Sequence, residues 1–169
     1  MIFWMSFADL RRRNAVRSAV DSSVLLDVLL PDPVFGEASA AALRHAIDSG
    51  AVIACEIVWA EVRASFPNDT VFLQAFDKLQ VQFDAVRREA SQMAGSIWKQ
   101  YRASARGRIR QHLIPDFIVG AHAAFQADVL VSRDRGFYRR YFSNLKLLDP
   151  SKSANGLVAA QRQMMDGSP

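Results

Sequence analysis

Short apolar segments alternate with helical segments along this 169-residue chain, and the alternation constrains the fold more than any other feature. Strands are predicted at residues 17–21, 51–55, 79–83, 128–132 and 145–149. Parallel strands need crossover connections, usually helices, which cover both faces of the sheet. The sequence therefore predicts an α/β fold with a central parallel sheet of four to five strands, flanked by helices on both faces.

The helical segments have recognisable starts and stops. They are predicted at residues 22–30, 36–50, 57–66, 69–78, 84–105, 115–127 and 136–142. Pro31 stops the first helix and Gly50 ends the second. Asp84 is expected to cap the fifth helix, and Pro115 to begin the sixth.

The length suits one domain, expected over residues 18–150, with an N-terminal extension (1–17) and a C-terminal tail (151–169) outside it. The extension is apolar first and basic second, the reverse of a signal peptide, and no apolar stretch has transmembrane length. Cys55 is the single cysteine, which excludes an intramolecular disulfide. We therefore expect a cytoplasmic protein without membrane contact.

Arginine dominates the positive charge of the chain. It accounts for 17 of the 21 basic residues, and the net charge is +4. Because the guanidinium fork suits phosphate groups, this composition favours a nucleic-acid partner, although a merely soluble basic protein fits the charge as well.

Four acidic residues stand close to the ends of predicted strands or to the starts of the adjoining helices. They are Asp21, Glu61, Asp116 and Asp134. Since ligands of parallel sheets gather at the carboxyl ends of the strands, we expect the four to converge on one pocket. Each also has a simpler explanation. The aspartates suit helix starts, as caps or first-turn acids, and Glu61 suits a solvated helix face.

Carboxylates that converge repel each other unless protons or a divalent cation compensate them. Ligand sets made only of oxygen favour Mg²⁺ or Mn²⁺ over Zn²⁺. The sequence has no glycine-rich phosphate loop, and its three histidines lack the spacing of a zinc site.

Four segments together resemble the PIN-domain ribonucleases, and most closely the VapC-type toxins of type II toxin–antitoxin systems. The segments are AVDSSVLLDVL, EIVWAEV, IPDFIVGAHA and VLVSRDRGFYRRYF, and the resemblance spans roughly residues 18–150. Asp21, Glu61, Asp116 and Asp134 occupy the acidic positions of the family pattern. Gly136 departs from it, because many members have a further acid there.

The resemblance implies an endoribonuclease that depends on Mg²⁺ or Mn²⁺. Asp21, Asp116 and Asp134 would bind the metal, and Glu61 would position the attacking water. Ser23 and Ser132 would support these ligands. The arginines of RASARGRIR and RDRGFYRR would grip the RNA backbone.

The resemblance further implies a cognate antitoxin and a homodimer. The apolar segments FLQAFDKL and MAGSIWKQY are expected to contact one of these partners, unless they simply pack in the core. Two other functions stay open. The protein could be a catalytically weak PIN-fold module that acts through partner binding, or a housekeeping PIN nuclease outside a toxin–antitoxin pair.

Overall fold

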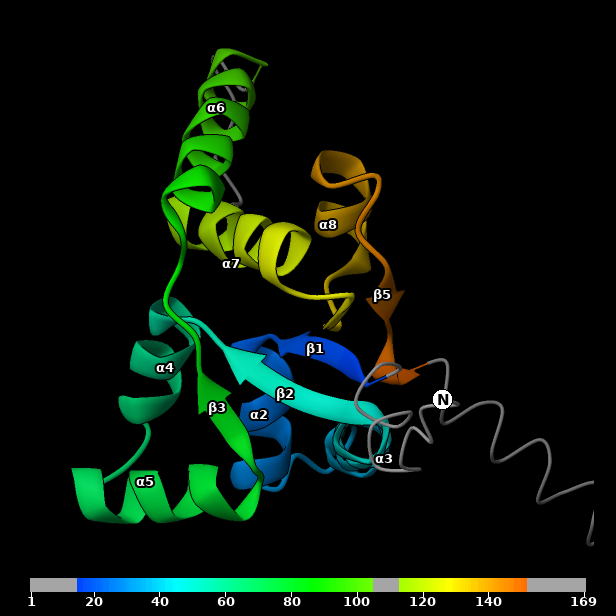
Figure 1. Ribbon diagram of the computed structural model, residues 1–169. Helices are drawn as coiled ribbons and strands as arrows, with labels where there is room; N and C mark the ends of the chain where they lie inside the picture. The colour runs from blue at the N-terminus through cyan, green and yellow to red at the C-terminus, as the bar shows by residue number, and fades with distance from the viewer. Residues whose placement is uncertain (1–14, 105–112, 152–169) are drawn as a thin grey trace, which may run out of the picture.

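A five-stranded parallel sheet with strand order β3-β2-β1-β4-β5 forms the centre of the fold (Figure 1). The computed structural model describes residues 15–104 and 113–151. The strands are β1 (Val16–Val20), β2 (Gly50–Ala54), β3 (Val81–Phe83), β4 (Val129–Val131) and β5 (Leu147–Leu148). The predicted α/β class and parallel sheet are therefore confirmed.

Helices cover both faces of this sheet, as predicted. In the described part of the chain they are α2 (Ser22–Leu29), α3 (Gly36–Ser49), α4 (Glu56–Arg63), α5 (Asp69–Lys78), α6 (Arg88–Ser104), α7 (Ile114–Gln126) and α8 (Arg135–Tyr141). Helices α2 and α3 lie on one side of the sheet, and α7, with α6 packed against it, lies on the other (Figure 1).

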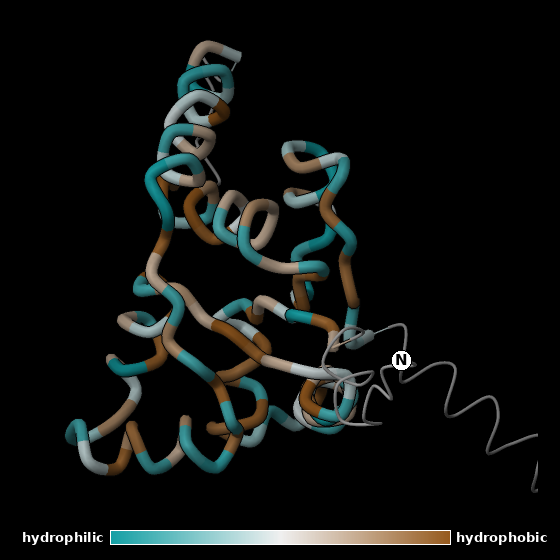
Figure 2. Tube along the Cα trace, in the orientation of Figure 1, coloured by the Kyte–Doolittle hydropathy of each residue, from teal (hydrophilic) through white to brown (hydrophobic). Residues whose placement is uncertain are grey.

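Apolar residues of the strands and of the facing helix surfaces form the core. In Figure 2 the strands carry much of the hydrophobic colour, whereas hydrophilic and hydrophobic residues alternate along α5 and α6. Phe117 of α7 is fully buried and stacks edge-on against Trp98 of α6 and Phe137 of α8. These aromatic contacts join the three helices on that side of the sheet.

Asp84 does not cap helix α6, so that prediction is wrong. The helix begins at Arg88, whereas Asp84 directly follows strand β3 and its backbone N–H donates a hydrogen bond to the Ala54 carbonyl. Its carboxylate accepts hydrogen bonds from Arg17 at 2.6 Å and Gln126 at 2.6 Å, and it bonds His122 at 2.9 Å. Three partners from β1 and α7 therefore outcompete the local capping geometry.

The first strand overlaps the predicted N-terminal extension. Strand β1 begins at Val16, two residues inside that extension, and the last described residue is Ser151. Residues 1–14 and 152–169, which hold the rest of the predicted extension and tail, lie outside the described residues. Among the helices described, none has the length and apolar character needed to cross a membrane.

Candidate active site

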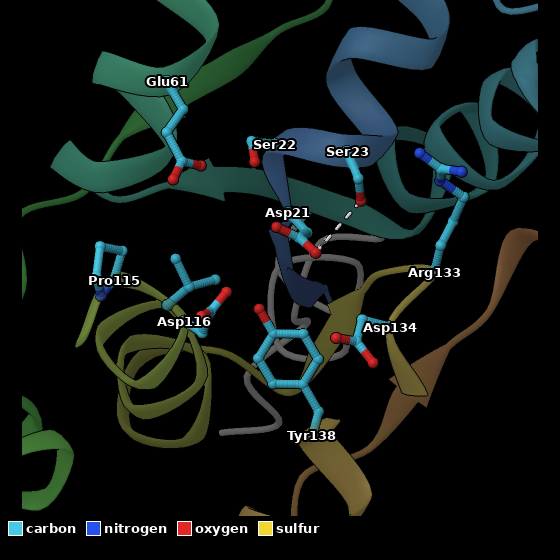
Figure 3. A pocket seen from close by; sticks show the side chains of 10 residues that line it. Asp21, Ser22, Ser23, Glu61, Pro115, Asp116, Arg133, Asp134 and Tyr138 are labelled. Atoms are coloured by element: carbon cyan, nitrogen blue, oxygen red, sulfur yellow. Dashed lines mark hydrogen bonds between the residues drawn. The ribbon is translucent and has the colours of Figure 1, made fainter. Parts of the chain in front are cut away.

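One cavity of about 510 Å³ opens at the carboxyl edge of the sheet (Figure 3). It is lined by Asp21, Ser22, Ser23, Glu61, Pro115, Asp116, Val119, Arg133, Asp134 and Tyr138. All four acids singled out in the sequence are among them. They come from four separate places in the fold: the end of β1, helix α4, the start of α7 and the connection between β4 and α8.

Asp21 lies at the centre of this edge because β1 and β4 pair side by side. Val20 is in register with Val131, and the Asp21 backbone N–H donates to the Val131 carbonyl at 3.0 Å. The Asp21 carboxylate accepts hydrogen bonds from the hydroxyls of Ser132 at 2.6 Å and Ser23 at 3.3 Å. Although Asp21 occupies the position before α2, its side chain makes no capping bond, so capping does not explain it.

Burial raises the pKa of Asp21 above its ordinary value of 3.8. Hydrogen bonds from Ser132 and Ser23 oppose this rise, while the negative charge of Glu61 adds to it. The ionised carboxylate is therefore held at an energetic cost, which a proton or a cation would relieve.

Asp116 and Asp134 each bond a backbone N–H at the start of a helix. Asp116 Oδ2 accepts from Leu113 at 2.8 Å, and Asp134 Oδ1 accepts from Phe137 at 3.1 Å. The helix-start role considered for each acid is thus present in the structure. It also orients both carboxyl groups at the cavity, so the two roles are compatible.

Glu61 lies on α4, is exposed and lines the cavity, on the side away from Asp134 in Figure 3. Its backbone position follows from the burial of Val58 and Val62, which face the core and leave Glu61 on the open face of the helix.

Tyr138 is a lining residue that the sequence reasoning missed. It is buried, and its hydroxyl points into the cavity among the acids (Figure 3). Burial raises its pKa well above 10.0, and Asp21, Asp116, Asp134 and Glu61 each add to the rise. The pKa of the Tyr138 hydroxyl therefore depends on all four carboxylates. The signal available in the sequence was its spacing, one helical turn after Asp134.

The donor set fits a hard divalent cation. The potential charged ligands in the cavity are carboxylates, and the lining residues that the structure describes include no histidine or cysteine. Within residues 15–104 and 113–151, no group of three or more acidic, histidine or cysteine side chains is already arranged to hold a metal ion. Ligand roles for Asp21, Asp116 and Asp134 therefore remain predictions.

The fold and this pocket define an α/β protein with an acidic cavity at the carboxyl edge of a parallel sheet. The family model described as "PIN domain" matches residues 19–143, so the chain belongs to the PIN-domain family. No curated protein matches the sequence significantly.

Several solved structures share this fold. VapBC2 from Rickettsia felis, bound to a DNA fragment from its promoter, is 14% identical with a TM-score of 0.60, over 79% of this chain and 98% of that one. FitAcB from Neisseria gonorrhoeae is 17% identical with a TM-score of 0.57, over 79% and 97%. VapC20 from Mycobacterium tuberculosis, a toxin that cleaves the sarcin–ricin loop, is 14% identical with a TM-score of 0.50, over 76% and 98%. At these identities the likeness shows the fold.

Proposed function

We propose that this protein is an Mg²⁺- or Mn²⁺-dependent endoribonuclease, the toxin component of a type II toxin–antitoxin pair. The observation that carries the proposal is the lining of one cavity by Asp21, Glu61, Asp116 and Asp134 in a PIN-domain chain. The similar folds of a toxin that cleaves the sarcin–ricin loop and of a toxin–antitoxin complex from Klebsiella pneumoniae support it.

In this proposal, a bound divalent ion would activate water and neutralise charge on the phosphate. Asp21, Asp116 and Asp134 would hold the ion, with the hydroxyl of Ser132 keeping the Asp21 carboxylate in place. Glu61 lines the cavity from α4 and would orient the attacking water. Tyr138 stays neutral and would present its hydroxyl as a hydrogen-bond donor to the substrate.

The proposed partners are a single-stranded or loop region of RNA, a cognate antitoxin and a second copy of the chain, all in the cytoplasm. The segments expected to contact a protein partner are mixed in burial: Phe72 and Phe76 belong to the core, whereas Leu73 is 47% exposed. Met93 and Ile97 line a second, smaller cavity. Core packing thus accounts for part of each segment and leaves apolar surface for a partner.

Cleavage of total RNA by the purified chain tests the proposal. We expect fragments in Mg²⁺ or Mn²⁺, none in EDTA, and loss of cleavage in Glu61→Gln and Asp116→Asn. A protein that binds metal and still leaves RNA intact would favour the alternative of a partner-binding PIN module. The protein encoded by the gene just upstream can be co-expressed with this chain. If it fails to suppress the cleavage, a housekeeping nuclease would be favoured.

A further inference from the structure

Among the described residues that line the acidic cavity, Arg133 is the one with a basic side chain. It stands between Ser132, which bonds Asp21, and Asp134, which lines the cavity itself. A polyanionic substrate that approaches several carboxylates needs a compensating positive charge close to them. The location of Arg133 provides that charge at the wall of the cavity.

The guanidinium of Arg133 is held in place from two sides. Its Nε lies 3.0 Å from Asp27 Oδ2, and its Cζ lies 4.3 Å from the centre of the Phe35 ring. Asp27 is 4% exposed and is itself fixed by a 2.6 Å hydrogen bond from the Ser39 hydroxyl. A buried carboxylate and an aromatic face therefore orient an arginine whose side chain is still 31% exposed.

The contact with Asp27 uses the Nε side of the guanidinium. Within the described residues, the two Nη atoms have no protein acceptor within hydrogen-bond geometry, and Arg133 is one of the residues that line the cavity. An arginine that keeps both terminal nitrogens available can bind a phosphate through two parallel hydrogen bonds. Because Asp27 and Phe35 already restrict its rotamers, less conformational entropy is lost on binding.

We propose that Arg133 binds a backbone phosphate of the RNA at the rim of the acidic cavity, and that Asp27 is the positioning residue that aims its guanidinium. This inference rests on the proposed ribonuclease function and names the residue that receives the substrate backbone. Arg133 was one of several arginines expected to contact RNA, and the structure distinguishes it by its buried carboxylate partner and its place at the cavity.

The salt dependence of RNA binding separates a phosphate contact from a structural ion pair. Binding of a fluorescein-labelled single-stranded oligoribonucleotide is measured by anisotropy in Mn²⁺, in a Glu61→Gln background that suppresses cleavage. The slope of log affinity against log salt concentration is negative, and losing one phosphate contact should reduce its magnitude by about 0.7. We expect this change for Arg133→Gln, together with an affinity loss of about tenfold.

Arg63 on α4 offers a control outside the segments expected to contact RNA. Its side chain is 34% exposed, close to the 31% of Arg133, and its Nε pairs with Asp69, but Arg63 does not line the cavity. Arg63→Gln should break an ion pair and leave the salt slope unchanged. Asp27→Asn should weaken RNA binding severalfold while keeping the slope, because the arginine is still present but less well oriented.

Three results would overturn the inference: an unchanged slope in Arg133→Gln, an equal fall of the slope in Arg63→Gln, or no RNA binding by the Glu61→Gln protein that serves as the background. If the Arg133→Gln variant fails to fold, the double variant Asp27→Asn/Arg133→Gln replaces it in the binding experiment. The double variant removes both charges and leaves no unpaired buried ion. Cleavage is scored separately with the wild-type chain. RNA binding with an Arg133-dependent slope but without cleavage would reject the nuclease proposal and keep the phosphate contact.

Discussion

The hydroxyl of Ser132 donates a 2.6 Å hydrogen bond to the Asp21 carboxylate, although 111 residues separate the two in the sequence. Each residue directly follows a strand, and those two strands, β1 and β4, are neighbours in the sheet. The Ser132 hydroxyl also accepts a 3.1 Å hydrogen bond from the Asp134 backbone N–H. One buried hydroxyl thus joins two of the acids that line the cavity.

Replacing Ser132 should weaken metal binding more than replacing Ser23. Ser132→Ala removes the short bond that favours the ionised form of Asp21, so we expect a loss of about 10- to 100-fold in Mn²⁺ affinity. Ser23→Ala removes a bond of 3.3 Å and should cost much less. Calorimetric titration with Mn²⁺ measures both, and equal affinities in the two variants would argue against the role given to Ser132.

Asp21→Asn should abolish cleavage while keeping the fold. The change preserves shape but removes a ligand charge, so we expect cleavage in Mg²⁺ to fall by more than the roughly 100-fold typical of residues that only orient a ligand. Without metal, thermal stability should hold or rise, because burial raises the pKa of Asp21 and penalises its charge.

The test of Asp21 pairs two measurements on each protein: RNA cleavage in Mg²⁺ and thermal melting in EDTA. Undiminished cleavage by Asp21→Asn would refute the catalytic role of Asp21. A variant that loses cleavage and melts far below the wild type would point to a structural role instead.

Acid should destabilise the fold through His122, which is 1% exposed. Burial lowers its pKa below 6.5 despite the opposing hydrogen bond to Asp84. Because the unfolded chain takes up this proton first, stability should fall as the pH drops from about 6.5 through the lowered pKa. Melting curves between pH 7 and pH 5 should show a weaker pH dependence in His122→Gln than in the wild type.

His45 provides the control for this experiment, because it is an exposed histidine on α3. His45→Gln should keep the pH dependence of the wild type. An identical pH dependence of stability in His122→Gln and wild type would contradict the role given to His122.

Asp84 should cause a second loss of stability at lower pH. Partial burial acts to raise its pKa, but the hydrogen bond with His122 and the charge of Arg17 outweigh burial and hold the pKa below 3.8. The stability that Asp84 contributes is present above pH 3.8 and disappears as the pH falls through the lowered pKa.

Two glycines should respond in opposite ways to alanine. A Cβ on Gly120 would lie 2.3 Å from the buried ring of Phe142, so Gly120→Ala should destabilise the fold by about 1–3 kcal/mol. Gly95, inside α6, has open space around it, so Gly95→Ala should stabilise by about 0.5–1 kcal/mol. Urea unfolding measures both free energies, and a Gly120→Ala protein as stable as the wild type would show that Phe142 can move aside.

The local pattern of the sequence was enough to place most helices and strands. The alternation of short apolar segments with helical segments predicted each strand to within a few residues. The segment 69–78 is helical from its first to its last residue, as predicted. Proline and glycine signals fell close to helix ends because their backbone restrictions act within one or two residues. The acids beside the strand ends could likewise be identified from the sequence. They were expected to meet because the carboxyl ends of parallel strands all lie at one edge of the sheet.

Contacts between distant segments were decided only by the tertiary structure. Asp84 reads as a helix cap in its local sequence, yet Arg17, His122 and Gln126 bind its carboxylate instead. Tyr138 joins the acids because α8 packs with its side chain toward the cavity. The pairing of Ser132 with Asp21 depends on β4 lying next to β1. Strand order reflects long-range packing, which no local pattern of residues encodes, so these relationships appear only once the chain has folded.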